Sequence, residues 1–497
     1  MKFLKNKNLI VALTFLTSMA NVLSQKAFAE TKEVNLTEPI LEKQIETEEY
    51  LYTKNFKTSI FDSPQKIERF DILQKSTRVS ILERKEVEVI DKIKVKHKTS
   101  SEEKPKVEIV EKKRIENWVH VKYRKNLKAR EGWALEKQFI SNPLENLPNS
   151  WEGLEVSNFP EKKEFEDNPR IDVKGVYLTV YSASYEKKLN ALIKLAKETE
   201  INTFVIDVKD DGGQLLWKMD DSILKYNKKA FSKTYIKDIN AFMKRLKDNN
   251  IYTIARIVSF KDPSYAKQNP DKAIIEKKSG KPFTNKDGVI WVSPHDKNLW
   301  EYNIKIAKEA AKVGFNEIQF DYVRFPASNG GKLDKFLDYR NPNNDSKPVT
   351  IQKYLKYAWK ELTPLHVYIN ADIYGQIGTF KDDMGLGQYW EALSGYTHYL
   401  SPMMYPSHYR KGAYGVPIPD AEPYKIIYKT TIDSINRNEN INNPAMIRPW
   451  LQDFTARWIK GHITYTDKEI REQIRALNDL GIHQYLLWSA SNRYHIK

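Results

Sequence analysis

The 497-residue chain is 40% hydrophobic, which is enough for a large core and for more than one domain. It has no cysteine, which excludes both structural disulfides and lipid attachment to an N-terminal cysteine. The formal net charge is +16, but the lysines are dispersed, and no arginine-rich stripe or known nucleic-acid module is visible. We therefore expect no nucleic-acid partner; the basic surface favours anionic envelope polymers or simple solubility.

The first 29 residues have the pattern of a secretory signal peptide. Lys2, Lys5 and Lys7 precede an apolar run over residues 9–22, and residues 27–29 (AFA) form an A-x-A cleavage site. The run is shorter than the roughly 20 residues that a membrane span needs, so an anchor is the weaker interpretation. We predict a secreted or cell-envelope protein with no stable membrane span after signal cleavage.

The next part of the chain is predicted to be a spacer followed by a small β domain. Residues 30–50 are polar and acidic, which is typical of a flexible spacer, and residues 51–142 show short strands with period-two alternation. An insertion at about residues 86–116 has two alternating arms around the polar stretch KHKTSSEEKPK, which predicts an extended hairpin. Residues 143–170 are rich in Pro, Asn and Glu and are interpreted as a linker.

Two tryptophan strands give the β domain a resemblance to a known family. Residues 118–123 (WVHVKY) are followed by a short basic turn and residues 132–135 (GWAL). This order resembles the end of a bacterial SH3-like domain, although the hairpin insertion departs from that pattern. Such domains often bind cell-wall peptide or glycan, so the resemblance implies a cell-wall polymer as a partner of this region.

From residue 171 to residue 497, predicted strands alternate with amphipathic helices. Eight strands are expected, at 173–182, 203–210, 251–260, 317–325, 366–374, 396–405, 445–454 and 483–491. Alternation with eight repeats predicts an α/β fold closed into a (β/α)8 TIM barrel, preceded by the small all-β domain. The alternative is an open doubly wound sheet, which is disfavoured because no Gly-rich phosphate turn follows the first strand.

The most informative strand is IQFDYVRFP, residues 318–326. Side chains of a strand alternate between two faces, so Ile318 and Phe320 share one face and Asp321 lies on the other. The strands TFVIDVKD and HVYINADIY place Asp207 and Asp372 in the same way. A core strand has no structural reason to carry a carboxylate there. We therefore expect the three aspartates to open into one cleft.

In a TIM barrel the active site lies at the C-terminal ends of the strands, so these aspartates are the predicted catalytic residues. Paired carboxyls can supply an acid and a nucleophile or base, and aromatic faces stack on sugar rings, so the pattern suits carbohydrate chemistry. The predicted substrate-binding residues at the same strand ends are Lys209, Asp210, Arg256, Tyr322, Arg324, Tyr374, Tyr405, His408, Trp450, Gln452 and Trp488. Asp211 follows the same strand as Asp207.

These residues also have structural interpretations. Asp207 could pair with Lys209 across the barrel mouth, and Asp321 could form a buried ion pair with Arg324. The two tryptophans could belong to the core, and Asp372 could cap a helix, a position that aspartate favours.

Six motifs, in this order, give the barrel region a specific resemblance: FVIDVKDDGG, ARIVSFKDP, FDYVRFP, ADIYG, SPMMYPSHY and IRPWLQDF. Residues 171–497 resemble a family of exported bacterial TIM-barrel proteins classed as glycoside hydrolases, similar to the α-amylase-like barrels. The resemblance implies a two-carboxylate glycosidase acting on a polysaccharide. In related barrels the nucleophile often ends strand 4 and the acid/base lies on the next strands, which implies Asp321 and Asp372. The acid/base is usually Glu there; Asp reaches one methylene less, which leaves retaining and inverting chemistry open.

The sequence lacks the motifs that other enzyme classes require. The histidines are scattered singly, and no Gly-x-Ser-x-Gly, dinucleotide or P-loop motif is present, so neither a metal nor another cofactor is expected. Two hypotheses remain: an exported glycosidase acting on an envelope or extracellular polysaccharide, or an inactive glycan-binding barrel tethered at the wall by its SH3-like domain. A separation of roughly 5–10 Å between Asp321 and another cleft acid would favour hydrolysis.

The two carboxyls of a glycosidase need opposite environments. We expect Arg324 or Arg256 beside Asp321, which would favour its ionised form. Burial or a neighbouring negative charge should keep Asp372 protonated, so that it can donate to the leaving oxygen.

Overall fold

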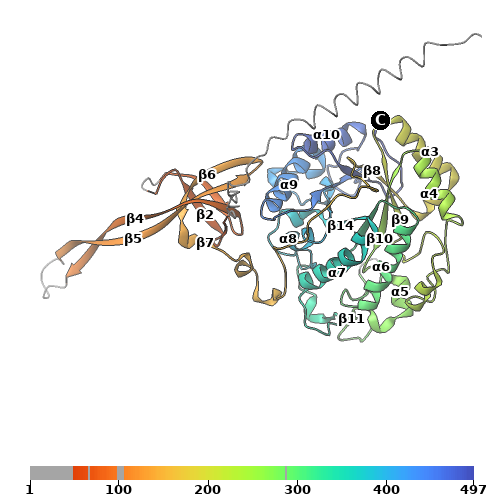
Figure 1. Cartoon of the computed structure of the whole chain (residues 1–497), viewed down its shortest axis with the longest axis horizontal. Coiled ribbons are helices and arrows are strands. Elements are labelled where there is room, and N and C mark those ends of the chain that lie inside the picture. Colours follow the sequence, from red (N-terminus) through yellow and green to blue (C-terminus); the bar gives the residue numbers. More distant parts are fainter. Residues whose placement is uncertain (1–48, 65–67, 98–105, 286–287) are drawn as a thin grey trace, which may run out of the picture. The chain divides into compact units, whose positions relative to one another are not determined.

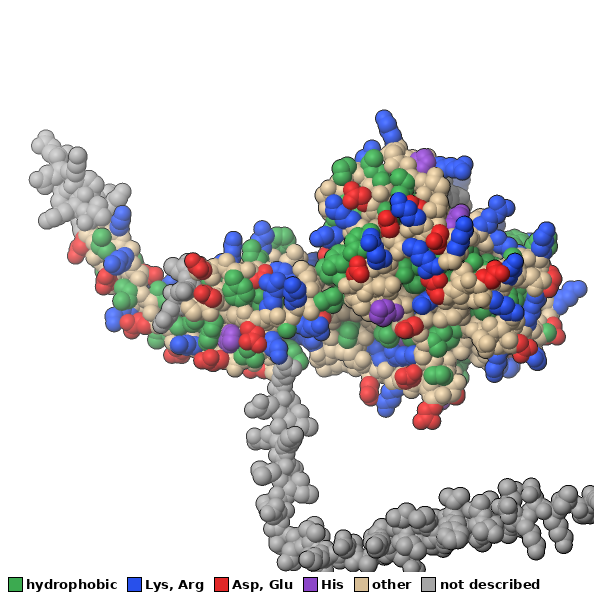
Figure 2. Space-filling view, turned by 90° about the horizontal axis from the view of Figure 1, so that it is seen from above, with side chains coloured by type: hydrophobic (Ala, Val, Ile, Leu, Met, Phe, Trp, Pro, Cys, Tyr) green, Lys and Arg blue, Asp and Glu red, His purple; other side chains and the backbone are tan. Residues whose placement is uncertain are grey.

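The computed structural model describes residues 49–64, 68–97, 106–285 and 288–497. The predicted signal peptide, the spacer up to residue 48 and the tip of the predicted hairpin at 98–105 lie outside this part of the chain. Within it, no helix combines the length and apolar character that a membrane crossing requires. Figure 2 shows Lys and Arg side chains spread over the visible face with Asp and Glu between them.

The N-terminal region is an antiparallel sheet of seven strands in the order β3-β2-β6-β5-β4-β1-β7. The strands are β1 Tyr50–Thr53, β2 Lys57–Phe61, β3 Arg69–Gln74, β4 Arg78–His97, β5 Lys106–Lys125, β6 Lys128–Leu135 and β7 Phe139–Ile140. Alternate side chains of these strands, among them Ile60, Val119 and Val121, form one buried apolar cluster. The all-β region expected before the barrel is therefore present.

Strands β4 and β5 form one long hairpin whose arms pair from Ser80↔Lys122 to His97↔Lys106. The two tryptophan strands lie side by side, since His120 on β5 pairs with Trp133 on β6 and stacks on its ring at 5.0 Å. Gly132 has to be glycine, because a Cβ there would come within 2.4 Å of the Ile60 side chain. The SH3-like assignment itself stays a prediction.

The C-terminal region is a closed parallel barrel, so the alternative of an open sheet is wrong (Figure 1). Its strands run in the order β14-β12-β10-β9-β8-β18-β17-β15, and β14 pairs with β15 to close the ring. They are β8 Lys174–Leu178, β9 Thr203–Lys209, β10 Tyr252–Val258, β12 Glu317–Asp321, β14 Tyr368–Tyr374, β15 Tyr399–Met403, β17 Trp450–Gln452 and β18 Tyr485–Trp488. The seventh predicted strand is split, with β16 at Met446–Ile447 preceding β17.

Helices surround the barrel, as the (β/α)8 prediction requires (Figure 1). They are α2 Val180–Ser184, α3 Glu186–Glu198, α4 Ile239–Asp248, α5 Pro263–Gln268, α6 Lys297–Lys312, α7 Lys347–Leu362, α8 Trp390–Ser394, α9 Pro423–Asn438 and α10 Asp467–Asn478. Each long helix buries one stripe; α3, for example, buries Leu189, Leu192 and Ile193. These stripes pack against the outward side chains of the strands in one large core.

Smaller elements complete the chain. A two-stranded sheet pairs β11 (Ile275–Glu276) with β13 (Leu337–Asp338). The 3-10 helices are η1 Glu136–Gln138, η2 Pro143–Asn146, η3 Asn149–Trp151, η4 Asp221–Lys225, η5 Pro270–Lys272, η6 Asp334–Phe336, η7 Thr363–Leu365, η8 Gly375–Gly378, η9 Pro406–His408, η10 Ala413–Gly415 and η11 Pro419–Ala421.

The predicted linker, residues 143–170, packs on the barrel. Leu154 and Val156 are buried in a cluster with Val349, Tyr389 and Ala392 of the α7–α8 region. Further along, the Asn168 side-chain amide donates to the carbonyls of residues 316 and 366, both at 2.8 Å. This stretch therefore contributes to the barrel core.

We expect a fragment of residues 171–497 to be less stable than a fragment of residues 143–497. The shorter fragment lacks Leu154 and Val156, and burial of each such side chain contributes about 1.5–3 kcal/mol. Thermal unfolding of the two purified fragments measures the difference. Equal melting temperatures would show that the segment adds nothing to the barrel.

Candidate active site

Asp321 and Asp372 lie at the same level of the barrel. Phe320 of β12 is in register with Ala371 of β14, and each aspartate is one residue further along its strand. Ile318 and Phe320 pack into the core between strands and helices, as the alternation predicts. Asp321 therefore faces the interior at the C-terminal end of its strand.

Asp207 lies deeper. It is in register with Arg256 of β10, which is in register with Gln319, whereas Asp321 is opposite Val258. Asp207 is thus two residues below Asp321 along the strands. A side chain has to reach the C-terminal opening of the barrel to contact a ligand. At its level Asp321 can do so more readily than Asp207.

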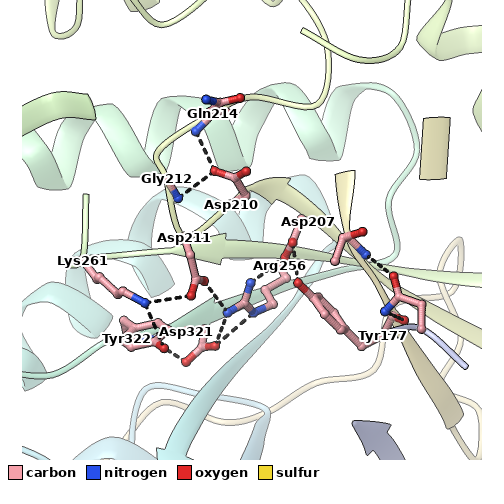
Figure 3. Close-up of polar contacts among 12 residues, drawn as sticks. Tyr177, Asp207, Asp210, Asp211, Gly212, Gln214, Arg256, Lys261, Asp321 and Tyr322 are labelled. Carbon is pink, nitrogen blue, oxygen red and sulfur yellow. Dashed lines mark hydrogen bonds and ion pairs between the residues drawn. The ribbon is translucent and has the colours of Figure 1, made fainter. Parts of the chain in front are cut away.

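The Arg256 guanidinium binds three carboxylates (Figure 3). Nη1 donates to Asp207 Oδ1 at 2.5 Å, and Nη2 donates to Asp211 Oδ1 at 3.0 Å. Asp321 Oδ2 accepts from both Nε (3.0 Å) and Nη2 (2.6 Å) of the same guanidinium. Arg256 is only 1% exposed, so these charge-assisted bonds are little screened by water.

Both oxygens of Asp207 are occupied. Besides the bond to Arg256, Oδ2 accepts from the Tyr177 hydroxyl at 2.6 Å. Burial, only partly offset by Arg256 and Tyr177, raises the pKa of Asp207 to about 7. Asp207 does not line the cavity described below. The sequence predicts that Asp207 opens into the cleft. In the structure it instead contacts Arg256 and lies outside the cavity lining.

The Asp321 carboxylate is fixed from a second side. The backbone N–H of Tyr322 donates to its Oδ1 at 2.5 Å. Tyr322 has φ = 48°, a left-handed conformation that costs free energy for a residue with a Cβ and that clusters at functional sites. Arg256 is thus the one of the two expected arginines that pairs with Asp321, and the alternative ion pair with Arg324 is not formed.

Asp211 and Lys261 form the rim of the same network. Lys261 Nζ donates to Asp211 Oδ2 at 2.8 Å and to the Tyr322 hydroxyl at 3.3 Å. Although burial opposes ionisation, the charges of Arg256 and Lys261 lower the pKa of Asp211. Asp211 is therefore an ionised carboxylate beside Asp321.

Asp372 has the opposite environment. It is 2% exposed, and its Oδ1 accepts from Trp450 Nε1 at 2.7 Å. Burial, together with the negative charge of Asp321, raises the pKa of Asp372 well above its usual value. Such a carboxyl retains its proton at a pH at which ordinary aspartates are ionised.

Asp321 and Asp372 line one cavity of about 260 Å³. Ligand pockets span roughly 300–1,000 Å³, so this cavity is suited to a small group such as a single sugar ring. The predicted residues that line it are Arg256, Asp321, Tyr322, Arg324, Asp372, Tyr374, Tyr405, His408, Trp450 and Trp488. Asp211, Gly375, Gln376, Met403 and Tyr409 complete the wall.

Lys209 was predicted to bind substrate, but its side chain points away from the cavity. The register of β9 against β10 shifts between Arg256 and Ile257, so Val208 is an extra residue and the alternation changes side. Lys209 is fully buried and donates to Asp262 (2.9 Å) and to Asn303 of α6 (2.6 Å).

Asp210 and Gln452 also lie outside the cavity lining. Asp210 Oδ1 accepts from the backbone N–H groups of residues 212 and 214, at 2.9 and 2.8 Å, and so holds the turn after β9 (Figure 3). The Gln452 side chain is buried and bonded to Ser407 N and Asp420 Oδ1, both at 3.0 Å. The two residues, both predicted to bind substrate, therefore lie outside this cavity, and each holds a loop.

We expect Lys209→Met to destabilise the protein by about 3–5 kcal/mol, because Asp262 would stay buried without its cation. The matched control is Lys244→Met, since Lys244 forms an exposed i,i+4 pair with Asp248. Such pairs contribute about 0.3–0.5 kcal/mol. Urea unfolding of both variants tests the difference; equal losses would mean that the Lys209–Asp262 pair has little net value.

The candidate set missed three residues of the network. Tyr177 lies on the inner face of β8, and Lys261 follows β10 in the motif SFKDP. Asp211 follows β9 and is not among the predicted site residues. Charged and hydroxyl groups at strand ends were the available signal, but loop residues such as Asp211 and Lys261 follow no alternation rule.

In the part of the chain that the structure describes, no group of three or more His, Cys, Asp or Glu side chains is arranged to hold a metal ion. Asp207, Asp211 and Asp321 pair with Arg256, and Asp211 also pairs with Lys261.

Residues 175–494 match the model of a family described as "Putative glycosyl hydrolase domain". No curated protein matches the chain.

Several solved structures are similar. A hypothetical protein from Ruminiclostridium thermocellum is 31% identical, with 42% of this chain and 98% of that chain covered and a TM-score of 0.35. The PgaB (BpsB) glycoside hydrolase domain from Bordetella bronchiseptica is 13% identical over 65% of this chain and 95% of that chain, with a TM-score of 0.45. Aspergillus fumigatus Ega3, in complex with galactosamine, is 10% identical over 68% and 98%, with a TM-score of 0.38.

Proposed function

The chain belongs to this glycosyl hydrolase family, and we propose that its barrel cleaves glycosidic bonds of a cell-envelope or extracellular polysaccharide by a two-carboxylate mechanism. One observation carries the proposal. An arginine-held carboxylate, Asp321, and a buried carboxyl with a raised pKa, Asp372, line the same cavity at the same barrel level. This is the pair of environments that glycoside hydrolysis requires.

In this mechanism Asp372 donates its proton to the leaving glycosidic oxygen as the bond to the anomeric carbon breaks. Asp321 either attacks that carbon or takes a proton from the attacking water. Arg256 and the Tyr322 N–H orient Asp321, while the bond from Trp450 orients Asp372. Asp207 acts indirectly, because it binds Arg256 and does not line the cavity.

Aromatic side chains support a sugar substrate. Trp488 lines the cavity, is partly exposed and stacks on Tyr177 at 4.2 Å. Tyr322 and Tyr374 are likewise half-buried cavity residues. Their rings can pack against the apolar faces of a pyranose, whereas Trp450 is buried and serves Asp372.

The proposal extends to where the enzyme acts. The N-terminal pattern of residues 1–29 supports export, and the WVHVKY and GWAL strands support an SH3-like domain. In this view the domain binds a cell-wall polymer and keeps the barrel close to its substrate, which raises the local concentration of glycan.

Incubation of the purified protein with an array of wall and secreted polysaccharides tests the function. The expected result is release of reducing ends from at least one polymer, and the anomer first formed distinguishes retention from inversion. Binding to a polymer without any release of reducing ends would favour the alternative, an inactive glycan-binding barrel.

A further inference from the structure

Arg324 is a cation of the cavity that lacks a carboxylate partner. The other cations of the site are matched: Arg256 binds three carboxylates and Lys261 binds Asp211. Among the residues that the structure describes, no Asp or Glu lies within ion-pair distance of Arg324, although Arg324 lines the cavity next to Asp321. Its charge is therefore free to meet a ligand.

The surroundings of Arg324 hold the guanidinium without neutralising it. Nη1 donates to the Phe325 carbonyl at 3.0 Å. The guanidinium carbon lies 5.0 Å from the ring centre of Trp291 and 5.2 Å from that of Tyr322. Cation–π contacts of this kind orient a guanidinium while leaving donor groups available.

The fully buried arginines of the chain follow a different pattern from Arg324, which is partly exposed in the cavity. Arg437 binds both oxygens of Glu391, and Arg448 binds both oxygens of Glu317 at 2.7 and 2.8 Å. Among the residues that the structure describes, full burial of an arginine thus goes with carboxylate partners, as the cost of removing the charge from water requires. Arg324 has no such partner among the described residues, so an oxyanion of a ligand in the cavity is the group that would complete the same pattern.

We propose that Arg324 binds an oxyanion carried by the glycan, a carboxylate, sulfate or phosphate group on the sugar in the cavity. The guanidinium presents paired N–H donors that match two oxygens of such a group. The proposal rests on the proposed function and narrows the substrate class to anionic glycans. The net charge of +16 supports it, because a basic protein attracts polyanions over long range.

Binding of simple sugars to the purified full-length protein tests the proposal. Glucuronate, glucose 6-sulfate and glucose 6-phosphate are titrated at constant ionic strength, with glucose as the neutral reference. Tryptophan fluorescence is the readout, since Trp291 contacts Arg324 and Trp488 lines the cavity. The three anions separate the carboxylate, sulfate and phosphate sources of the same chemistry.

We expect at least one anion to bind at least about ten-fold more tightly than glucose, and Arg324→Gln to remove that preference. Arg324→Lys should retain part of it, because the charge remains but the paired donors are lost. The control is Arg245→Gln, which alters an arginine on α4 that pairs with Glu186. Circular dichroism verifies that each variant is folded.

Two results would overturn the proposal. One is that no anion binds the wild type better than glucose, and the other is that folded Arg324→Gln binds anions as the wild type does. Hydrolysis separates this inference from the proposed function. Cleavage of a neutral glycan at equal rates by the wild type and Arg324→Gln rejects only the anion site. Arg324-dependent anion binding without cleavage of any polymer rejects only the glycosidase.

Discussion

Replacing Asp321 by asparagine is expected to lower turnover on a confirmed glycan by at least about 10³-fold, while the protein stays folded and still binds the glycan. The one amide oxygen of asparagine can still accept both bonds from Arg256, so the side chain stays in place although the Tyr322 N–H loses its acceptor. What it cannot do is act as a nucleophile or base, because the amide is neutral. Initial rates of reducing-end release and a binding isotherm measure the two effects separately.

Asp210→Asn is the matched control for this prediction. It makes the same chemical change after β9, two strands from β12 in the barrel, but Asp210 only accepts backbone N–H groups in its turn, which asparagine also does. Its activity should remain close to that of the wild type. If Asp321→Asn keeps most of its activity, the assignment is wrong, and Asp372 or Asp211 becomes the candidate.

Asp372→Asn is expected to lower kcat/KM by about 10²–10⁴-fold, the usual contribution of a general acid. Asparagine can still accept the bond from Trp450 but has no acidic proton to give. The loss should be much smaller for an aryl glycoside with a strongly acidic leaving group, which departs without protonation. Asp321→Asn should be equally inactive on both kinds of substrate, and a uniform loss in Asp372→Asn would refute the acid role.

The raised pKa of Asp372 also predicts effects of pH. Wild-type activity should fall as the pH rises through this pKa, since only the protonated form donates. In the unfolded chain the carboxyl ionises near about pH 3.9. Between the two pKa values the folded protein holds a proton that the unfolded chain has lost, so the free energy of unfolding decreases as pH rises. Asp372→Asn has no carboxyl at this position and so avoids this decrease in stability. It should melt at a higher temperature than the wild type at neutral pH.

Period-two alternation predicted much of the barrel and its mouth. The helix-facing positions of Ile318 and Phe320 follow from it, as does the cavity position of Asp321. Regular strands allow this, because each backbone step fixes the direction of the next side chain. The same rule placed Asp372 on the cavity wall.

The prediction failed where regularity ends. The extra residue in β9 turned Lys209 toward α6, and no residue type in TFVIDVKD marks such a bulge. Depth was the second difficulty, since alternation gives the face of Asp207 but not its level relative to Asp321. The pairing partner of Asp321 was the third difficulty: Arg256 lies on β10 and Arg324 follows β12, and only the three-dimensional register selects Arg256.

Because Arg256 is shared, a change at Asp207, below the cavity, can alter the pKa of Asp372. Asp207, Arg256 and Asp321 form a row of alternating charges, and the charges of Asp321 and Arg256 act in opposite directions on the pKa of Asp372. Above its own pKa of about 7 Asp207 offsets part of the Arg256 charge, so neutralising Asp207 there leaves more positive charge near Asp372 and lowers the pKa of Asp372. Evolution can therefore move the working pH range of such an enzyme by changing a side chain that no sugar ever meets.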